Sequence, residues 1–127
     1  MVNKSLNENM SLIDVLRRIN ESMADFWDSP AKTASDRGSS NDCPLHKVAI
    51  WGDVNAAKVL LKNGADINAA GEDDDTPLHR AIAGEKIEMA RFLISQGADV
   101  HIENMYGNTS LDDAAISSCP DLVALSK

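Results

Sequence analysis

The chain has 127 residues, of which 43% are hydrophobic and 25% charged, and its 12 basic and 20 acidic residues give a formal net charge of −8. This length suits one domain, and the composition is ordinary for a soluble globular chain. The acidic balance argues against nucleic-acid binding, which usually needs a face of Lys and Arg, and no apolar run is long enough to span a bilayer.

The start of the chain and its cysteines bear on its compartment. Residues 1–8 lack the continuous apolar stretch of a secretory signal. Cys43 and Cys119 are the only cysteines, which is too few for a disulfide framework. A reducing environment fits this usage, so we expect a cytoplasmic protein.

The first predicted element is an amphipathic helix from Ser11 to about Trp27. Ser11 followed by Asp14 is typical of a helix N-terminus. Apolar residues then recur at helical spacing, namely Leu12, Val15, Leu16, Ile19 and Met23. The helix is expected either to cap the helical stack that follows or to bind a partner or a second copy. Its polar face is mixed in sign, which argues against a membrane-surface helix.

A loop or linker is predicted next, over residues 29–42. This stretch contains Pro30, Gly38 and four serines, which disfavour regular structure. We therefore divide the chain into an N-terminal segment, residues 1–38, and a second domain, residues 39–127.

The second domain is built from a repeat with a period of 33 residues. Cys43-Pro44-Leu45-His46 recurs as Thr76-Pro77-Leu78-His79, and weakly as Thr109-Ser110-Leu111-Asp112. Asn63-Gly64-Ala65-Asp66 recurs as Gln96-Gly97-Ala98-Asp99. Each proline suits the first turn of a helix, and each glycine suits a left-handed helix end. A fixed period of this length is typical of a stacked helical array.

The repeat predicts two helices in each unit. In the first unit a short helix begins at Pro44 and a second covers Val54 to Lys62, and in the second unit the helices cover Pro77 to Ala83 and Lys86 to Ser95. The third unit is shortened, with a first helix within residues 107–115 and a second over Cys119 to Leu125, where Pro120 falls in the first turn. The predicted units are about 39–73, 74–106 and 107–127.

These motifs and their spacing resemble the ankyrin-repeat family. The residues that carry the resemblance are Pro44, Leu45, His46, Gly64, Thr76, Pro77, Leu78, His79 and Gly97. The resemblance implies an all-α solenoid of stacked helix-turn-helix units with short β-hairpin-like fingers, preceded here by the N-terminal amphipathic helix. It also implies protein binding rather than a reaction.

His46 and His79 could be read as metal ligands or as a base, but the resemblance implies a structural role. It places each histidine between units, with a ring nitrogen hydrogen-bonded to backbone in the adjoining turn. Cys43 and His46 have metal-ligand spacing, yet a closed zinc site needs four ligands. Cys43 is instead expected as a small buried substitute for threonine, and we expect no metal or cofactor.

The densest charge in the chain, Glu72-Asp73-Asp74-Asp75, falls at the finger between the first two units. A calcium loop needs alternating oxygen ligands, whereas these acids are consecutive. The remaining alternatives are a solvated loop tip and a contact for Lys or Arg of a partner. Asp74 stands where the family usually has Gly, and Asp tolerates left-handed geometry better than most residues.

The resemblance implies a concave face for partner binding, made of two positions that follow the inward Ala pair of each first helix and of the finger tips. Carried over, the helix positions are Ile50, Trp51, Ala83, Gly84, Ile116 and Ser117, and the finger positions are Ser39, Ser40, Asp42, Glu72, Asp73, Asp75, Met105, Tyr106 and Asn108. Trp51 is the favoured anchor, the alternative being that it packs on the N-terminal helix or linker. Gly84-Glu85, set against Trp51-Gly52, leaves two turn registers open.

The predicted function is non-enzymatic protein recognition, as a scaffold or regulatory subunit or as an inhibitor. The net acidity favours a partner with a basic surface. One specific alternative is an immunity-type protein that covers the active cleft of a basic toxin or enzyme. No phosphate-binding loop, nucleophile elbow or zinc-protease motif is present, and the adjacent Asp112 and Asp113 face different sides of a helix. We therefore expect neither an enzyme nor a small-molecule substrate.

Overall fold

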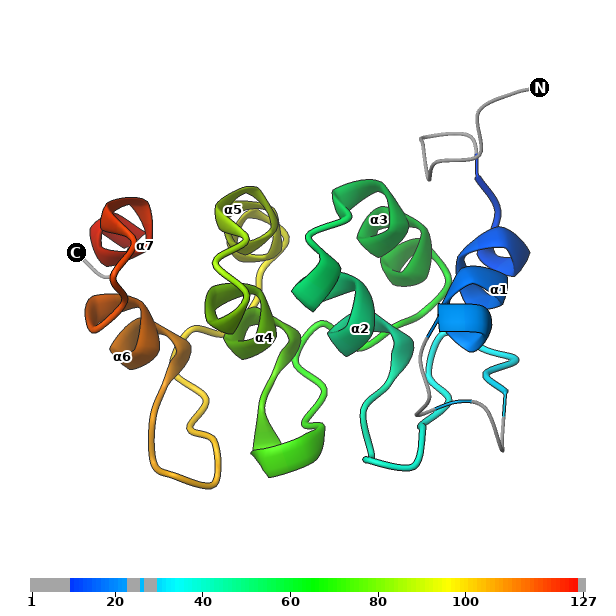
Figure 1. Cartoon of the computed structure of the whole chain (residues 1–127), viewed down its shortest axis with the longest axis horizontal. Helices are drawn as coiled ribbons and strands as arrows, with labels where there is room; N and C mark the ends of the chain where they lie inside the picture. The colour runs from blue at the N-terminus through cyan, green and yellow to red at the C-terminus, as the bar shows by residue number, and fades with distance from the viewer. Residues whose placement is uncertain (1–9, 23–25, 27–29, 126–127) are drawn as a thin grey trace.

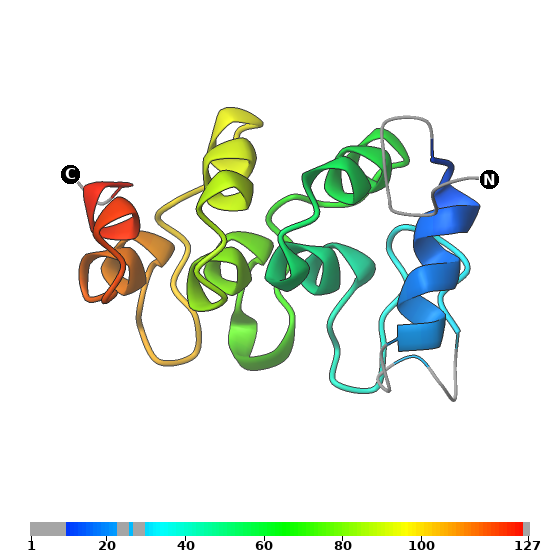
Figure 2. The same cartoon turned by 45° about the horizontal axis from the view of Figure 1, so that its top comes forward.

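The computed structural model describes residues 10–22, 26 and 30–125, and these residues form an elongated stack of helices (Figure 1). Three helix pairs follow one another along the long axis, with α1 beyond the first pair, and the loops between pairs project to one side in both views (Figure 2). The helices are α1 (Leu12–Ser22), α2 (Pro44–Trp51), α3 (Val54–Lys62), α4 (Pro77–Ala83), α5 (Ile87–Ser95), α6 (Ser110–Ala115) and α7 (Pro120–Leu125), and a short 3-10 turn, η2 (Glu72–Asp74), lies in the second loop. The described chain is thus all-helical, as predicted.

The core lies between successive pairs. The first helices α2, α4 and α6 pack in one row, α3 packs on α5 in a second row, and each first helix also packs on the second helix of its own pair. Each unit buries the apolar residues that keep the 33-residue period, for example Leu45 and Leu78, and Leu60 and Leu93. No single unit could bury these faces alone, so stacking stabilises all three.

Capping residues set where the first helices begin. Pro44 and Pro77 occupy the first turn of α2 and α4. The Thr76 backbone N–H donates to His79 Nδ1 (3.1 Å), and the Thr76 hydroxyl accepts from the His79 backbone N–H (3.3 Å). Thr109 and Asp112 form the same box at the start of α6, with distances of 2.9 and 3.1 Å. These local bonds satisfy helix N–H groups that lack partners within the helix.

The turn between the two helices of a unit keeps the 33-residue register without a shift. Gly52 has φ +79°, and Glu85, at the equivalent position, has φ +57°. The residue after each turn closes it in the same way, because Asp53 N–H donates to the Val48 carbonyl and Lys86 N–H to the Ala81 carbonyl. Of the two registers left open by the sequence, the direct alignment of Gly52 with Glu85 is the one found.

The loops between units, called fingers below, repeat closely. Each is closed by one backbone bond, from Gly38 N–H to the Asp42 carbonyl in the first and from Gly71 N–H to the Asp75 carbonyl in the second, and from Asn104 to Asn108 in the third. No strand is assigned within the described residues, so the hairpin-like fingers are tight loops without a β-ladder. A left-handed residue follows the same period, at Asn41, Asp74 and Gly107.

At the N-terminal end, α1 packs on α2 and α3 and buries Val15, Leu16 and Ile19. This packing favours the capping interpretation of the N-terminal helix. The regular helix ends at Ser22 and Phe26 is buried in the core, while the predicted extension through Met23 and Trp27 lies outside the described residues. The linker is hydrogen-bonded to α1, because the Asn20 side chain donates to the Ala31 carbonyl (3.0 Å) and accepts from the Ala31 N–H (2.8 Å).

Candidate functional site

The two motif histidines bridge neighbouring units. His46 accepts a hydrogen bond at Nδ1 from the Cys43 N–H (3.1 Å), so its Nε2 carries the proton and lies 2.8 Å from the Asp75 carbonyl of the next finger. His79 Nε2 lies 3.0 Å from the Asn108 carbonyl in the same way. Both rings are buried, as is Cys43. The histidines therefore hold the fingers in place, which is the role that the resemblance implied.

Burial shifts the pKa values of two neighbouring side chains, His46 and Cys43. It lowers the pKa of His46, although the nearby Asp42 charge raises it and the Arg80 charge lowers it further. Burial also raises the pKa of the Cys43 thiol. A buried neutral histidine beside a buried protonated thiol is inert structural packing rather than a nucleophile with its base.

Fully buried Asp42 links the first two units. It accepts from both terminal nitrogens of Arg80 (2.9 and 3.2 Å), from the Glu72 backbone N–H (2.8 Å), and it pairs with Lys47 Nζ (3.2 Å). Arg80 also donates from Nε to Asp75 (3.2 Å). A cation on one first helix is thus held between the carboxylates of two fingers. We call this cluster of Asp42, Lys47, Asp75 and Arg80 the joint. The resemblance predicts Asp42 and Asp75 at partner-binding positions, whereas both carboxylates pair with Arg80 inside the joint.

The sequence does carry a signal for the joint. Asp42 and Asp75 are 33 residues apart, and so are Lys47 and Arg80. In the third unit Asn108 stands at the position of Asp42 and Asp75, and Asp113 stands at the position of Lys47 and Arg80. Opposite charges that recur together at the repeat period indicate a repeated ion pair. These charges lie outside the helix-start and helix-end motifs that reveal the repeat.

Asp113 therefore stands where the first two units have a cation. Burial raises the pKa of its carboxyl, the Asp75 and Asp112 charges raise it further, and His79 lowers it. Within the part of the chain that the structure describes, no cation pairs with the Asp113 carboxylate. This carboxylate is half-buried and faces negative charge, which is unfavourable unless a cation joins it.

The tips of the second and third fingers are joined by a backbone bond. Met105 N–H donates to the Asp73 carbonyl (2.8 Å). Asp73 and Asp74 both have positive φ, near +60°, and their side chains are exposed together with that of Glu72. Asp74 is left-handed as predicted, and Asp73 adds a second strained residue that the sequence did not indicate. The backbone bond thus joins a finger tip with exposed acids to a finger tip with the exposed apolar side chain of Met105.

Large apolar side chains are exposed at five described positions. Their exposed fractions are 38% for Ile50, 61% for Met105, 68% for Tyr106, 82% for Ile116 and 67% for Ile13. The first four are concave-face positions predicted from the resemblance, whereas Ile13 lies on α1. Among the described residues, four of the five large exposed apolar side chains thus occupy positions that the resemblance predicts for the concave face, and one lies on α1. Exposed apolar side chains that lie together are typical of an interaction surface.

Trp51 is partly covered by the N-terminal helix. The Arg18 guanidinium lies over its ring at 4.4 Å from the ring centroid, and the same arginine donates to Asp53 at 2.9 Å. The structure thus realises the alternative in which Trp51 packs on the N-terminal helix. Only the remaining exposed part of the ring is open to a partner.

The remaining predicted positions are small or polar. Ala83 and Asn108 are exposed, Gly84 lies against Ile50, and Ser39, Ser40 and Ser117 are exposed or half-buried. Because these side chains offer little apolar area, they are expected to line a contact rather than to anchor it.

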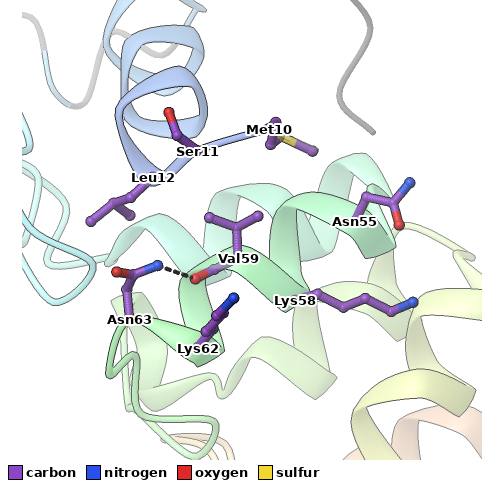
Figure 3. A pocket seen from close by; sticks show the side chains of 8 residues that line it. All are labelled: Met10, Ser11, Leu12, Asn55, Lys58, Val59, Lys62 and Asn63. Carbon is purple, nitrogen blue, oxygen red and sulfur yellow. Dashed lines mark hydrogen bonds between the residues drawn. The ribbon is translucent and has the colours of Figure 1, made fainter. Parts of the chain in front are cut away.

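An open cavity of about 490 Å³ lies between the start of α1 and α3 and was not anticipated from the sequence (Figure 3). Its lining residues are Met10, Ser11, Leu12, Asn55, Lys58, Val59, Lys62 and Asn63. The Asn63 side chain donates a hydrogen bond to the Val59 carbonyl (2.8 Å). The Lys58 Nζ lies 5.9 Å from the centroid of the Phe92 ring. Elsewhere among the described residues, no cluster of His, Cys, Asp and Glu is placed to hold a metal, and no helix is long and apolar enough to cross a membrane.

Comparison with known proteins agrees with the geometry. Residues 45–94, which span α2 to α5, match the family model for ankyrin repeats (many copies). A comparison with curated proteins found no match.

Proposed function

Because this chain is an ankyrin-repeat protein, and ankyrin repeats generally act as protein–protein interaction modules, we propose that it binds another protein through its concave face. That face is formed by the exposed ends of α2, α4 and α6, at Ile50, Ala83 and Ile116, together with the finger tips. The proposal describes a binding module, and no step of it requires a catalytic group.

The distribution of exposed apolar side chains carries the proposal. Four of the five large exposed apolar residues occupy predicted concave-face positions, and two of them, Ile50 and Ile116, are equivalent in the repeat. Leaving such groups in water costs about 25 cal/mol for each Å² that a partner would otherwise cover. The concave face therefore has the most to gain from being covered.

A photo-crosslinking scan tests the location. A photoreactive phenylalanine is introduced singly at Tyr106, Ile50 or Ile116, and at Ile13 as the matched control. Tyr106 and Ile13 are almost equally exposed, at 68% and 67%, so accessibility alone cannot distinguish them. We expect one protein to be captured from the three concave-face positions and not from Ile13.

Affinity measurements with the captured protein complete the test. Truncating one central anchor, in Tyr106→Ala or Ile116→Ala, should cost about 2 kcal/mol, which corresponds to about thirty-fold in Kd. Ile13→Ala should leave the Kd unchanged. Capture from Ile13 alone would place the binding surface on α1 and contradict the proposal.

Two modes of action remain compatible with such binding, a scaffold or regulatory subunit and an inhibitor. The acids at the second finger tip favour the inhibitor, because an acidic surface can cover a basic cleft. An activity assay on the captured protein separates the two. Loss of that protein's activity in proportion to occupancy supports inhibition, including the immunity-type role, whereas unchanged activity supports a scaffold.

A further inference from the structure

Successive units are joined by a cation held between two finger carboxylates, and this joint is incomplete at the third unit. Lys47 pairs with Asp42, and the equivalent Arg80 pairs with both Asp42 and Asp75. The next equivalent residue is Asp113, so the carboxylate of Asp75 has a cation from its own unit and none from the described residues of the unit that follows. The third unit thus has the carboxylate of Asp113 at the position where the first two units have a cation.

Among the described residues of the third unit, no Lys or Arg can supply the missing charge. Residues 92–125 contain five acids and no Lys or Arg. Burial raises the pKa of the Asp113 carboxyl, and the charges of Asp75 and Asp112 raise it further, while His79 lowers it. A metal ion fits poorly, because both oxygens of Asp75 already accept hydrogen bonds, from Arg80 (3.2 Å) and Asn104 (3.1 Å). A side-chain cation needs far fewer ligands than a metal does.

Apolar side chains follow Asn104 in the third finger, and the Asn104 side chain donates to Asp75 (3.1 Å). Met105 and Tyr106 are 61% and 68% exposed at the tip of the third finger. The backbone bond from Met105 to Asp73 fixes this tip beside the exposed acids of the second finger. A ligand that carries a cation and an apolar group next to each other is complementary to both features.

We propose, resting on the proposed function, that the third unit anchors the partner through one Lys or Arg side chain seated against Asp113 and Asp75, with a neighbouring apolar side chain against Met105 and Tyr106. The partner's cation takes the place that Lys47 and Arg80 fill within the chain. The anchoring end of the concave face is thus the third unit, while Trp51 at the other end serves the N-terminal helix.

Synthetic peptides provide the probe. Each peptide holds one Leu or Phe flanked by Lys or Arg in a Gly-Ser background, and the control peptides carry Glu in place of the basic residues. Binding is followed by amide chemical shifts at increasing peptide concentration. We expect shifts confined to residues 105–113 and 73–75 for the basic peptides, weakened by salt, and none for the acidic peptides.

Substitutions separate charge from fold. Asp113→Asn should weaken peptide binding about ten-fold, since hydrogen bonds to charged groups are among the stronger ones. Glu88→Gln on the outer face of α5 removes the same charge and should have no effect. Asp113→Arg is the decisive variant, because its guanidinium can complete the joint to Asp75. It should raise the melting temperature and abolish peptide binding.

The outcomes are distinguishable from failure of the proposed function. If Asp113→Asn and Glu88→Gln bind the basic peptides equally, or if the shifts scatter over the whole chain, the anchor is wrong even when crosslinking still captures a partner from Ile50. If Asp113→Arg binds as well as the unaltered chain, it is also wrong. If sedimentation shows a dimer of the unaltered chain that Asp113→Arg dissociates, the occupant is a second copy, which overturns the proposed partner segment.

Discussion

Replacing Asp42 by alanine should weaken the protein more than removal of any exposed carboxylate, because its side chain is fully buried and engages four donors. Removing one member of a buried ion pair costs about 3–5 kcal/mol, since the partner charge stays buried. Arg80 keeps Asp75 as a partner, and Lys47 retains some access to water, so we expect about 3 kcal/mol. That is a large part of the 5–15 kcal/mol that typically holds a domain together.

Urea unfolding, followed by far-ultraviolet circular dichroism, measures this loss. Asp99→Ala is the control, because the Asp99 side chain is exposed and accepts one hydrogen bond, from the His101 N–H (2.8 Å). This substitution should cost less than about 1 kcal/mol. The Asp42→Ala loss should persist at high salt, since buried pairs are screened little. A loss below about 1 kcal/mol, or one that salt removes, would show that the joint contributes no more than a surface pair.

Three further outcomes are expected. Arg18→Ala should lower the free energy of unfolding by about 1 kcal/mol, because the guanidinium no longer covers the Trp51 ring. It should also change the fluorescence of Trp51, measured in a Trp27→Phe background, and unchanged fluorescence would contradict the contact. Because burial lowers the pKa of His46, stability should fall as the pH drops below the ordinary histidine value of 6.5, and His46→Gln should flatten that fall in urea titrations. Because burial raises the pKa of Asp113, its ionisation opposes folding, and Asp113→Asn should be stabilising near neutral pH. This gain in stability should vanish below pH 3.8, the ordinary pKa of an aspartate, and a gain that is independent of pH would refute this cause.

The helices were predictable because their signals are local. Pro77 in the first turn marked the start of α4, and the left-handed Gly64 marked the end of α3. The bounds of both helices are those predicted, and Pro120 opens α7 in the shortened third unit as expected. Lys86 was expected inside α5 and caps it instead, a difference of one residue. Such boundaries depend on residues within one turn of each other, which a motif comparison can see.

The joint and the tryptophan contact were not predictable in the same way. Arg80 and Asp42 are 38 residues apart and meet only because two units stack, and Arg18 reaches Trp51 from an element outside the repeat. The sequence suggested Trp51 as the leading anchor because it follows the inward alanine, yet that position faces the N-terminal helix in the first unit alone. The identity of a neighbour across a unit boundary depends on packing rather than on the residues beside it in the chain.

The joint between units also makes the second unit compatible with a copy of itself. A tandem duplication of residues 74–106 would set the copied arginine against Asp75, as Arg80 now stands against Asp42. The copied histidine-bearing helix would likewise meet a finger that offers it a carbonyl. Lengthening the array in this way would add an interface that repeats the contacts of Arg80. A copy of the third unit could not repeat them, because Asp113 stands at the position of Arg80. The position of the arginine thus determines where this chain can grow by internal duplication.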